Sequence, residues 1–338
     1  MSLDMRPHYP VMLNEILKIL QKNKKKIIVD CTFGCGGYSD KILEFFPQIK
    51  IIAIDRDIEV KKFAKELEKK YFKRFFFIND KFSNLEKIVN DYQDEIGFYI
   101  FDFGISSFQL DNYSRGFSFN SEDKLDMRMG NNSISAYEIL NEAPFQDLSS
   151  IIKIFGEDND HKKIANEIVN SRKIKTIHST KDFRNLIIKA KGNRYYKKDP
   201  CTKTFQAIRM IVNQELSEIF NALKFALDFS KAGTGLVAVT FHSLEDKIVK
   251  KIFNITKDSL QNPSRYLPQI NSKKNESSFL EKINLKPITP SKEEIATNYR
   301  SRSAKMRSVL KQGNGKLHIE RKMLNMERFF FLEEKYNV

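Results

Sequence analysis

A glycine-rich turn and an aspartate about twenty residues later are the residues best suited to bind a nucleotide-type ligand. The stretch 30–40 reads DCTFGCGGYSD, with the glycine turn at 34–38, and stands between an apolar run at 27–29 and an amphipathic run at 41–46. Glycine lets the main chain take positive φ and lie against a ligand, and a helix that begins there offers free N–H groups. Asp55 ends the next apolar run, where a carboxylate can accept hydrogen bonds from both hydroxyls of a ribose. Together they indicate a site for an adenosine-containing ligand.

Two other interpretations of the turn are open. Glycine is also common in plain loops between a strand and a helix. A dinucleotide site would need the pattern G-x-G-x-x-G, but Ser39 stands where the last glycine is required.

Two more polar segments follow apolar runs further along the chain. Asp102 opens the segment DFGISSFQLD, and His242 opens HSLED. Because ligands bind at the carboxyl ends of the strands in open parallel sheets, we expect both segments to border one crevice. Alternatively, His242 is a loop histidine bonded to the backbone, and Glu245 and Asp246 are helix caps or surface pairs.

The elements that must position these residues alternate along the first third of the chain. A helix at 10–22 leads into predicted strands at 27–29, 51–54, 75–78 and 98–103, with helices at 41–46, 60–71 and 85–89 between them. This alternation predicts βαβ units and a parallel sheet.

Only helical patterns recur between residues 109 and 203. They cover 135–140, 145–155, 161–172 and 180–190. Beyond them we expect a helix at 205–229, a strand at 235–241, a helix at 244–255, a mobile loop at 256–284, a strand at 304–310 and a terminal helix around 329–332.

The composition is that of a globular protein with a basic surface. The chain has 338 residues, a length sufficient for about two domains, and 41% of them are hydrophobic. Its formal net charge is +15. That charge favours a polyanionic partner such as nucleic acid, although a general bias toward lysine would explain it too. There is no run of about eighteen apolar residues and no secretory pattern at the start, so we expect a cytoplasmic protein without a membrane partner.

Cysteine and histidine do not suggest a metal site. Cys31, Cys35 and Cys201 lack metal-ligand spacing, and the five histidines are scattered. We therefore expect reduced cysteines and no bound metal.

A series of longer motifs occurs in a fixed order between His8 and about Leu310. They are GG at 36–37, IDRD at 54–57, DFGISS at 102–107 with QLD at 109–111, RGFSF at 115–119, LDMRM at 125–129, TFQAIR at 204–209 with VN at 212–213, FHSLED at 241–246 and RSRSAKMR at 300–307. Together these motifs resemble the family of ribosomal RNA small-subunit methyltransferase H, also called MraW.

The resemblance implies an α/β fold of the class I S-adenosylmethionine methyltransferase type, Rossmann-like and mostly parallel, with an inserted helical domain. The implied boundaries are 1–112 and 205–311 for the methyltransferase domain, 113–204 for the helical substrate-recognition domain and 312–338 for a C-terminal extension. The implied reaction is methylation of the exocyclic N4 of a cytosine in the decoding region of 16S rRNA, with S-adenosylmethionine as the donor.

Carried over residue by residue, the family's cofactor contacts fall on Gly36, Gly37, Tyr38, Asp55, Phe82, Asp102 and Gln109. Asp55 would hold the ribose, Phe82 would face the adenine, and Asp102 would lie near the ring or the methionine part. Tyr38 stands where the family usually has histidine, and Lys203 where it usually has arginine.

The resemblance also suggests how the substrate is held. We expect Asp102 or His242 to hold the amine of the cytosine and receive its proton. Six arginines are expected to contact RNA phosphates around the crevice, or alternatively to form internal ion pairs: Arg115, Arg128, Arg209, Arg300, Arg302 and Arg307.

Two competing functions are a methyltransferase with a protein or small-metabolite acceptor and an RNA-binding assembly factor without catalysis. The sequence also leaves open whether the substrate is naked 16S rRNA or the assembled small subunit, and whether the protein is a homodimer.

Overall fold

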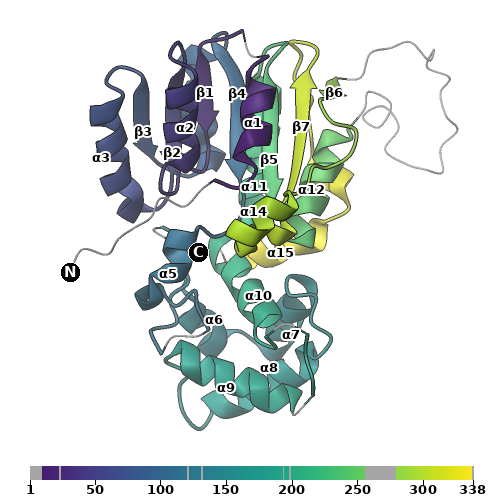
Figure 1. Cartoon of the computed structure of the whole chain (residues 1–338). Coiled ribbons are helices and arrows are strands. Elements are labelled where there is room, and N and C mark those ends of the chain that lie inside the picture. Colours follow the sequence, from purple (N-terminus) through teal and green to yellow (C-terminus); the bar gives the residue numbers. More distant parts are fainter. Residues whose placement is uncertain are drawn as a thin grey trace, which may run out of the picture. The chain divides into compact units, whose positions relative to one another are not determined.

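The computed structural model describes residues 10–22, 24–119, 122–130, 132–192, 194–197, 199–255 and 279–336. They form two compact units. The sheet unit holds the described residues up to Gly104 and those from Glu218 to Asn325, and the helical unit holds those from Ile105 to Ser217 and from Met326 onward (Figure 1).

The sheet unit is built on a seven-stranded sheet with the order β3-β2-β1-β4-β5-β7-β6. The strands are β1 (Ile27–Asp30), β2 (Lys50–Asp55), β3 (Phe75–Asn79), β4 (Ile96–Asp102), β5 (Gly235–Thr240), β6 (Leu280–Lys282) and β7 (Lys305–Lys311). Strands β1 to β5 are parallel, whereas β7 is antiparallel to both β5 and β6. This mixed, mostly parallel sheet confirms the fold class expected from the sequence.

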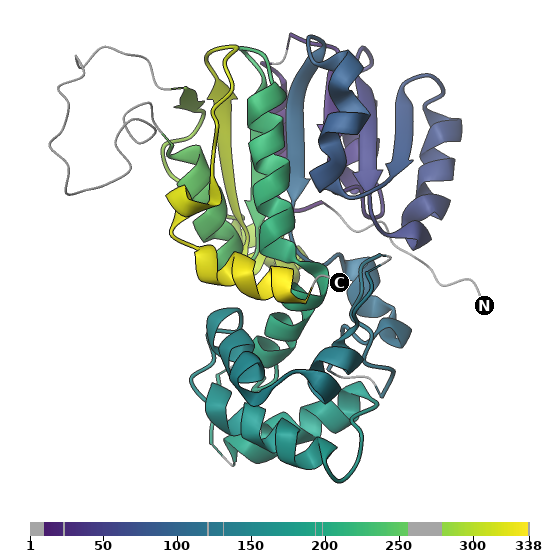
Figure 2. The ribbon, with the colours of Figure 1, turned by 180° about the vertical axis from the view of Figure 1, so that it is seen from behind.

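Helices cover both faces of the sheet. Figure 1 shows α1 (Leu13–Leu20) and α2 (Gly37–Phe45) in front of it, and Figure 2 shows α11 (Glu215–Phe229) against the opposite face. The other helices of this unit are α3 (Lys61–Lys70), α4 (Leu85–Val89), α12 (Ser243–Phe253) and α14 (Lys292–Thr297). Because both faces are covered, β1, β4 and β5 are buried along almost their whole length and consist of nearly continuous apolar residues.

The helical unit contains no extended strand among its described residues. Its helices are α5 (Ser107–Asp111), α6 (Ala136–Glu142), α7 (Phe145–Ile154), α8 (His161–Arg172), α9 (Thr180–Lys191), α10 (Thr202–Asn213) and α15 (Glu327–Lys335). Helix α8 packs between α7 and α9, and Phe183 and Phe205 stack in the core with ring centroids 4.8 Å apart. A buried ion pair, Lys191 Nζ to Asp158 Oδ2 at 2.7 Å, also lies in this core. No helix in the described part of the chain is both long and apolar enough to cross a bilayer.

Two expected elements differ in the structure. The single helix at 205–229 is in fact two helices, α10 and α11, because Gln214 takes a left-handed conformation with φ of 51°. The expected mobile loop at 256–284 contains the edge strand β6, which pairs with β7. Residues 256–278 lie outside the described residues.

The helical unit also extends beyond the expected insertion of 113–204. Its first segment runs from Ile105 to Ser217, and the end of the chain completes it. In α15, the buried carboxylate of Glu333 accepts the N–H groups of Leu216 at 3.0 Å and Ser217 at 2.8 Å. Since the first N–H groups of a helix have no partner within it, Glu333 caps the start of α11. The last helix, which the sequence predicts around 329–332, therefore packs as part of this unit.

The Glu333→Ala variant is expected to lose about 1–3 kcal/mol of local stability, because two buried N–H groups lose their acceptor. Hydrogen exchange at the amides of Leu216 and Ser217 measures this loss directly. The exposed neighbour Glu334, changed to alanine, is the matched control and should alter stability by less than about 0.5 kcal/mol. Equal exchange in both variants would contradict the capping role.

Candidate active site

The glycine turn joins β1 to α2 in the conformation that its residues predict. Gly34 has φ of 54° and Gly36 has φ of 81°, and Gly36 is the N-cap of α2. A Cβ on Gly36 would lie 2.7 Å from Leu67 and 2.8 Å from the ring of Phe33, so no larger residue fits there. Gly37 is the first residue of the helix.

Asp55, at the end of β2, is fastened to this turn. Its Oδ2 accepts the N–H of Gly34 at 2.7 Å, and its Oδ1 accepts the N–H of Asp57 at 2.9 Å. Burial raises the pKa of Asp55 to about 6, and the nearby carboxylates of Asp57 and Asp30 add to that rise, while the two backbone hydrogen bonds oppose it. The structure therefore brings together the turn and the acid that the sequence pairs.

Three neighbouring strands, β2, β1 and β4, each end in an aspartate: Asp55, Asp30 and Asp102. Parallel strands place these carboxyl groups at one edge of the sheet. Mutual repulsion and burial disfavour their ionised forms. An edge of this kind favours a ligand that carries positive charge.

Asp102 is the candidate reactive group of this edge. Its N–H donates to Thr32 Oγ1 at 2.7 Å, while its Oδ1 is buried and has no hydrogen-bond partner among the described residues. Burial raises the pKa of Asp102 well above its ordinary value, and the carboxylates of Asp30 and Glu245 raise it further. A carboxyl group with an unused buried oxygen is suited to meet a donor from a ligand.

Asp30 opens the stretch that contains the glycine turn, but the sequence alone predicts no role of its own for it; in the structure it ends the strand that leads into the turn. It is fully buried, and its Oδ2 accepts the hydroxyl of Ser39 at 2.6 Å. Burial raises its pKa to about 6, against the effect of the hydrogen bonds from Ser39 and Thr32. The signal that could have revealed it is an acid at the buried end of an apolar strand.

Tyr38 and Phe82 provide aromatic surface in the same unit. The buried Tyr38 donates its hydroxyl hydrogen to the backbone oxygen of Val11, so that hydrogen is already used within the protein. Phe82 follows β3 and is half-buried, with its ring edge-on to Phe101 and Phe103 at centroid distances of 6.4 and 6.0 Å. The contact of Phe82 with adenine stays a prediction.

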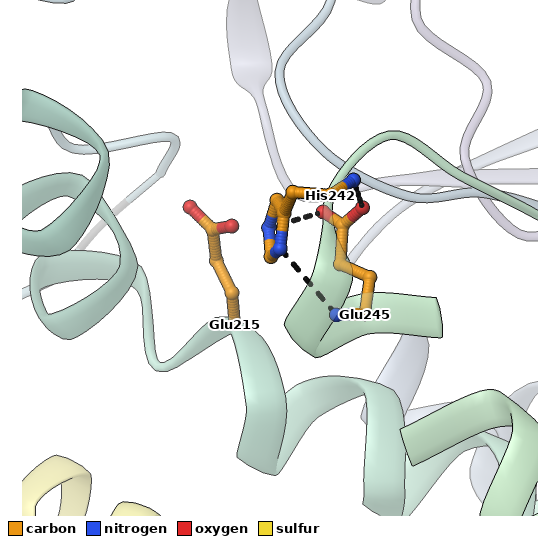
Figure 3. Close-up of side chains that lie close together, drawn as sticks. All are labelled: Glu215, His242 and Glu245. Carbon is orange, nitrogen blue, oxygen red and sulfur yellow. Dashed lines mark hydrogen bonds and ion pairs between the residues drawn. The ribbon is translucent and has the colours of Figure 1, made fainter. Parts of the chain in front are cut away.

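His242 lies two residues after β5 and is the N-cap of α12. Its Nδ1 accepts the N–H of Glu245 at 3.4 Å, and its Nε2 lies 2.9 Å from Glu245 Oε1 (Figure 3). The carboxylate of Glu245 in turn accepts the N–H groups of Phe241 and His242 at 2.7 and 3.3 Å. The alternatives weighed for these residues, a histidine bonded to the backbone and a capping glutamate, therefore describe their geometry. A catalytic role for His242 stays a prediction.

Gln109 belongs to the helical unit, in α5. It forms a capping box with Ser106: its Oε1 accepts the N–H of Ser106 at 3.1 Å, and its own N–H donates to Ser106 Oγ at 3.2 Å. Its contact with a cofactor stays a prediction.

The six arginines fall into two groups. Three guanidinium groups each donate two hydrogen bonds to one carboxylate: Arg128 to Asp126, Arg209 to Glu215 and Arg307 to Asp246. These three guanidinium groups are committed to internal ion pairs, the alternative considered from the sequence.

The other three arginines differ in exposure. Arg115 donates to the backbone oxygen of Arg128 at 2.8 Å and lies over the ring of Phe117. Arg300 and Arg302 are exposed, and Arg302 stacks 4.1 Å above the ring of Tyr299, which is itself 66% exposed. The exposed pair is better placed to contact a polyanion than the three arginines in internal ion pairs.

Comparison with known proteins identifies the family. The sequence model of the MraW methylase family matches residues 5–312. The chain belongs to this family. The seven-stranded sheet is accordingly that of a class I S-adenosylmethionine methyltransferase, and the resemblance carried by the motifs is confirmed.

Relatives in the MraW family match this chain over most of its length. The proteins named "Ribosomal RNA small subunit methyltransferase H" from Orientia tsutsugamushi and Rickettsia bellii are 41% and 40% identical to it, over 90% of this chain and 98% and 99% of their own. The protein of that name from Caldicellulosiruptor saccharolyticus is 42% identical, over 90% of this chain and 98% of its own.

The family match ends before the last helix of the structure. Helix α15, with the capping residue Glu333, lies beyond residue 312. Among solved structures, an rRNA methylase from Streptococcus thermophilus matches 86% of this chain and 89% of its own with 9% identity and a TM-score of 0.37, too low to support an argument.

Proposed function

We propose that this MraW-family protein transfers the methyl group of S-adenosylmethionine to the exocyclic N4 of a cytosine in the decoding region of 16S rRNA. The observation that supports this most strongly is the agreement of two findings: the family match over residues 5–312 and the acid-lined edge next to the glycine turn. The named relatives are small-subunit ribosomal RNA methyltransferases. We likewise propose that it acts in the cytoplasm, because that is where such RNA is found.

The residues at this edge fit S-adenosylmethionine. Asp55, oriented by the N–H groups of Gly34 and Asp57, would accept hydrogen bonds from the ribose hydroxyls, and Phe82 would contact the adenine. The bound donor supplies a methyl group on a positively charged sulfonium, and that charge would favour the ionised forms of Asp30 and Asp102, which burial and neighbouring acids otherwise disfavour.

Binding of S-adenosylmethionine is expected to weaken about tenfold between pH 7 and pH 5. The pKa of Asp55 is raised to about 6, so the group is ionised above that pH and protonated below it. A carboxylate accepts from both hydroxyls and attracts the sulfonium, so binding favours the ionised form and releases the proton. Calorimetric titrations across this range measure the effect, and the Asp55→Asn variant should show a smaller dependence. Affinity that is constant or rises toward acid pH would contradict the assignment.

Asp102 is the residue that we propose as the partner of the cytosine amine. The lone pair of that amine is delocalised into the ring, so an acceptor that holds its N–H groups makes the nitrogen more available. The unused buried Oδ1 can serve as that acceptor. A carboxylate with a raised pKa is also a stronger base than an exposed one, so Asp102 can receive the proton of the nitrogen as that nitrogen attacks the methyl carbon.

RNA binding is proposed to rely on the basic surface, with its formal net charge of +15, and on the exposed Arg300 and Arg302. The stack of Arg302 on Tyr299 offers a charged and aromatic surface for phosphates and unstacked bases. The three arginines in internal ion pairs would support the fold of the RNA-binding surface rather than bind phosphate.

Changing Arg302 to alanine is expected to weaken binding of small-subunit RNA several-fold and to lower the slope of log affinity against log salt by about one. Affinity for S-adenosylmethionine should not change. Filter binding at several salt concentrations measures both quantities for the RNA. Lys322→Ala removes the same charge from a side chain that is 70% exposed and paired with Glu320, so it is the control. If the slope for Arg302→Ala equals that of the wild-type protein, Arg302 does not contact the RNA.

The function itself is tested with a donor that carries a labelled methyl group. The wild-type protein should label small-subunit RNA, either naked or in the assembled subunit, and comparison of the two shows which is the substrate. Binding of the donor with label in protein or metabolites instead of RNA would favour another acceptor. Absence of donor binding would favour an assembly factor.

A further inference from the structure

The carboxylate of Glu245 lies between the segment that follows β4 and the segment that follows β5. It is completely buried, although it is the third residue of a helix that begins at the edge of the sheet. A Cβ built on Gly104 would lie 3.4 Å from Glu245 Oε1 and 3.6 Å from the ring of Phe241. A side chain at position 104, two residues after Asp102, would therefore meet the carboxylate of Glu245.

We propose that Glu245 is a positioning residue of the methyl-transfer site: it fixes the imidazole of His242 in one tautomer and orientation, beside the segment that follows Asp102. This inference rests on the proposed function, and it assigns Glu245 a role beyond that of a helix cap.

The hydrogen bonds at His242 select the tautomer. Nδ1 faces the N–H of Glu245, so it must be the acceptor, and the hydrogen of a neutral imidazole then sits on Nε2. Nε2 in turn lies 2.9 Å from Glu245 Oε1, an acceptor (Figure 3). Both ring nitrogens therefore approach the same residue: Nδ1 accepts a hydrogen bond from its N–H, and Nε2, which has no hydrogen-bond partner among the described residues, lies close to its carboxylate.

The second carboxylate oxygen of Glu245, Oε2, binds the backbone instead of the imidazole. Oε2 accepts the N–H of Phe241 and the N–H of His242, which fixes the backbone where β5 leads into α12. On the other side, the N–H of Phe103 donates to Val239 at 2.9 Å, which joins the end of β4 to β5. The charge of Glu245 also acts on Asp102. A change at Glu245 should therefore reach the reactive edge through both segments.

The variant Glu245→Gln tests the role of the carboxylate with almost no change in shape. If the amide oxygen faces the two backbone N–H groups, the amide NH₂ faces the Nε2–H of His242; the reverse orientation sets the NH₂ against those backbone groups. Either way two donors meet, so the imidazole must change its tautomer or move.

Nitrogen-15 NMR of the imidazole rings detects this change without any substrate. The His242 signals are identified by their loss in His242→Asn, which keeps a good N-cap side chain. We expect a protonated Nε2 and an unprotonated Nδ1 in the wild-type protein and an altered pattern in Glu245→Gln. The same pattern in both proteins would overturn the proposal.

Turnover then separates positioning from general stability. We expect Glu245→Gln to lower kcat about tenfold or more, with the KM for S-adenosylmethionine changed less than about threefold, and Glu44→Gln on the exposed face of α2 to leave both unchanged. If Glu245 acts through His242, the kcat of the double variant Glu245→Gln/His242→Asn is no lower than that of the worse single variant. Multiplied losses, or wild-type kcat in Glu245→Gln, would overturn the proposal. A wild-type protein that does not methylate the RNA would refute the proposed function, while the NMR result would still decide the tautomer.

Discussion

The Asp55→Ala variant is expected to bind S-adenosylmethionine at least about 100-fold more weakly than the wild-type protein. Hydrogen bonds to a charged acceptor contribute about 1.5–3 kcal/mol each, and about 1.4 kcal/mol corresponds to a factor of ten. Two ribose hydroxyls would lose such an acceptor. The N–H of Gly34 would lose its acceptor as well, so the glycine turn would no longer be held beside the end of β2.

Isothermal titration calorimetry measures this effect directly. Glu44→Ala is a suitable control, since it removes an acid of the same charge from α2, where the side chain is 59% exposed and paired with Lys41. The control should bind the donor as the wild-type protein does. Wild-type affinity in Asp55→Ala would mean that the ribose is held elsewhere.

Replacing Asp102 by asparagine is expected to lower kcat about 10²- to 10⁴-fold, the range typical of a lost general base. The amide keeps the shape of the carboxyl group and can still accept a hydrogen bond, but it cannot receive the proton of the cytosine amine. Because burial and the neighbouring acids raise the pKa of the native carboxyl group, the loss of basicity is large.

Single-turnover rates at saturating donor isolate this chemical step. Asp94→Asn makes the same substitution at a side chain that is 88% exposed, and its rate should be that of the wild-type protein. A normal rate in Asp102→Asn would assign the proton to another group, with His242 the next residue to test.

The sequence alone predicts those features of the fold that short-range patterns control. The turn at 34–38 and Asp55 could be paired from the sequence because glycine conformation and the order of parallel strands decide their meeting. The helix α8 lies at 161–172, where its apolar spacing predicts it.

Features that depend on tertiary contacts were not predictable in the same way. Nothing near Gln214 marks the break between α10 and α11, because glutamine has no preference for the left-handed conformation. The acid that caps α11, Glu333, comes from the far end of the chain. The ion pairs of Arg209 and Arg307 likewise need a folded chain before their partners become apparent. The motifs mark these arginines as notable but do not distinguish an RNA contact from an internal pair.

The most direct test of the whole account is mass-spectrometric mapping of modified nucleosides in small-subunit RNA after incubation with the protein and S-adenosylmethionine. The account predicts a single new N4-methylated cytidine in the decoding region, absent with Asp55→Ala and strongly reduced with Asp102→Asn. A methyl group on another base or on another atom of cytosine, or unmodified RNA with wild-type protein that binds the donor, would contradict it.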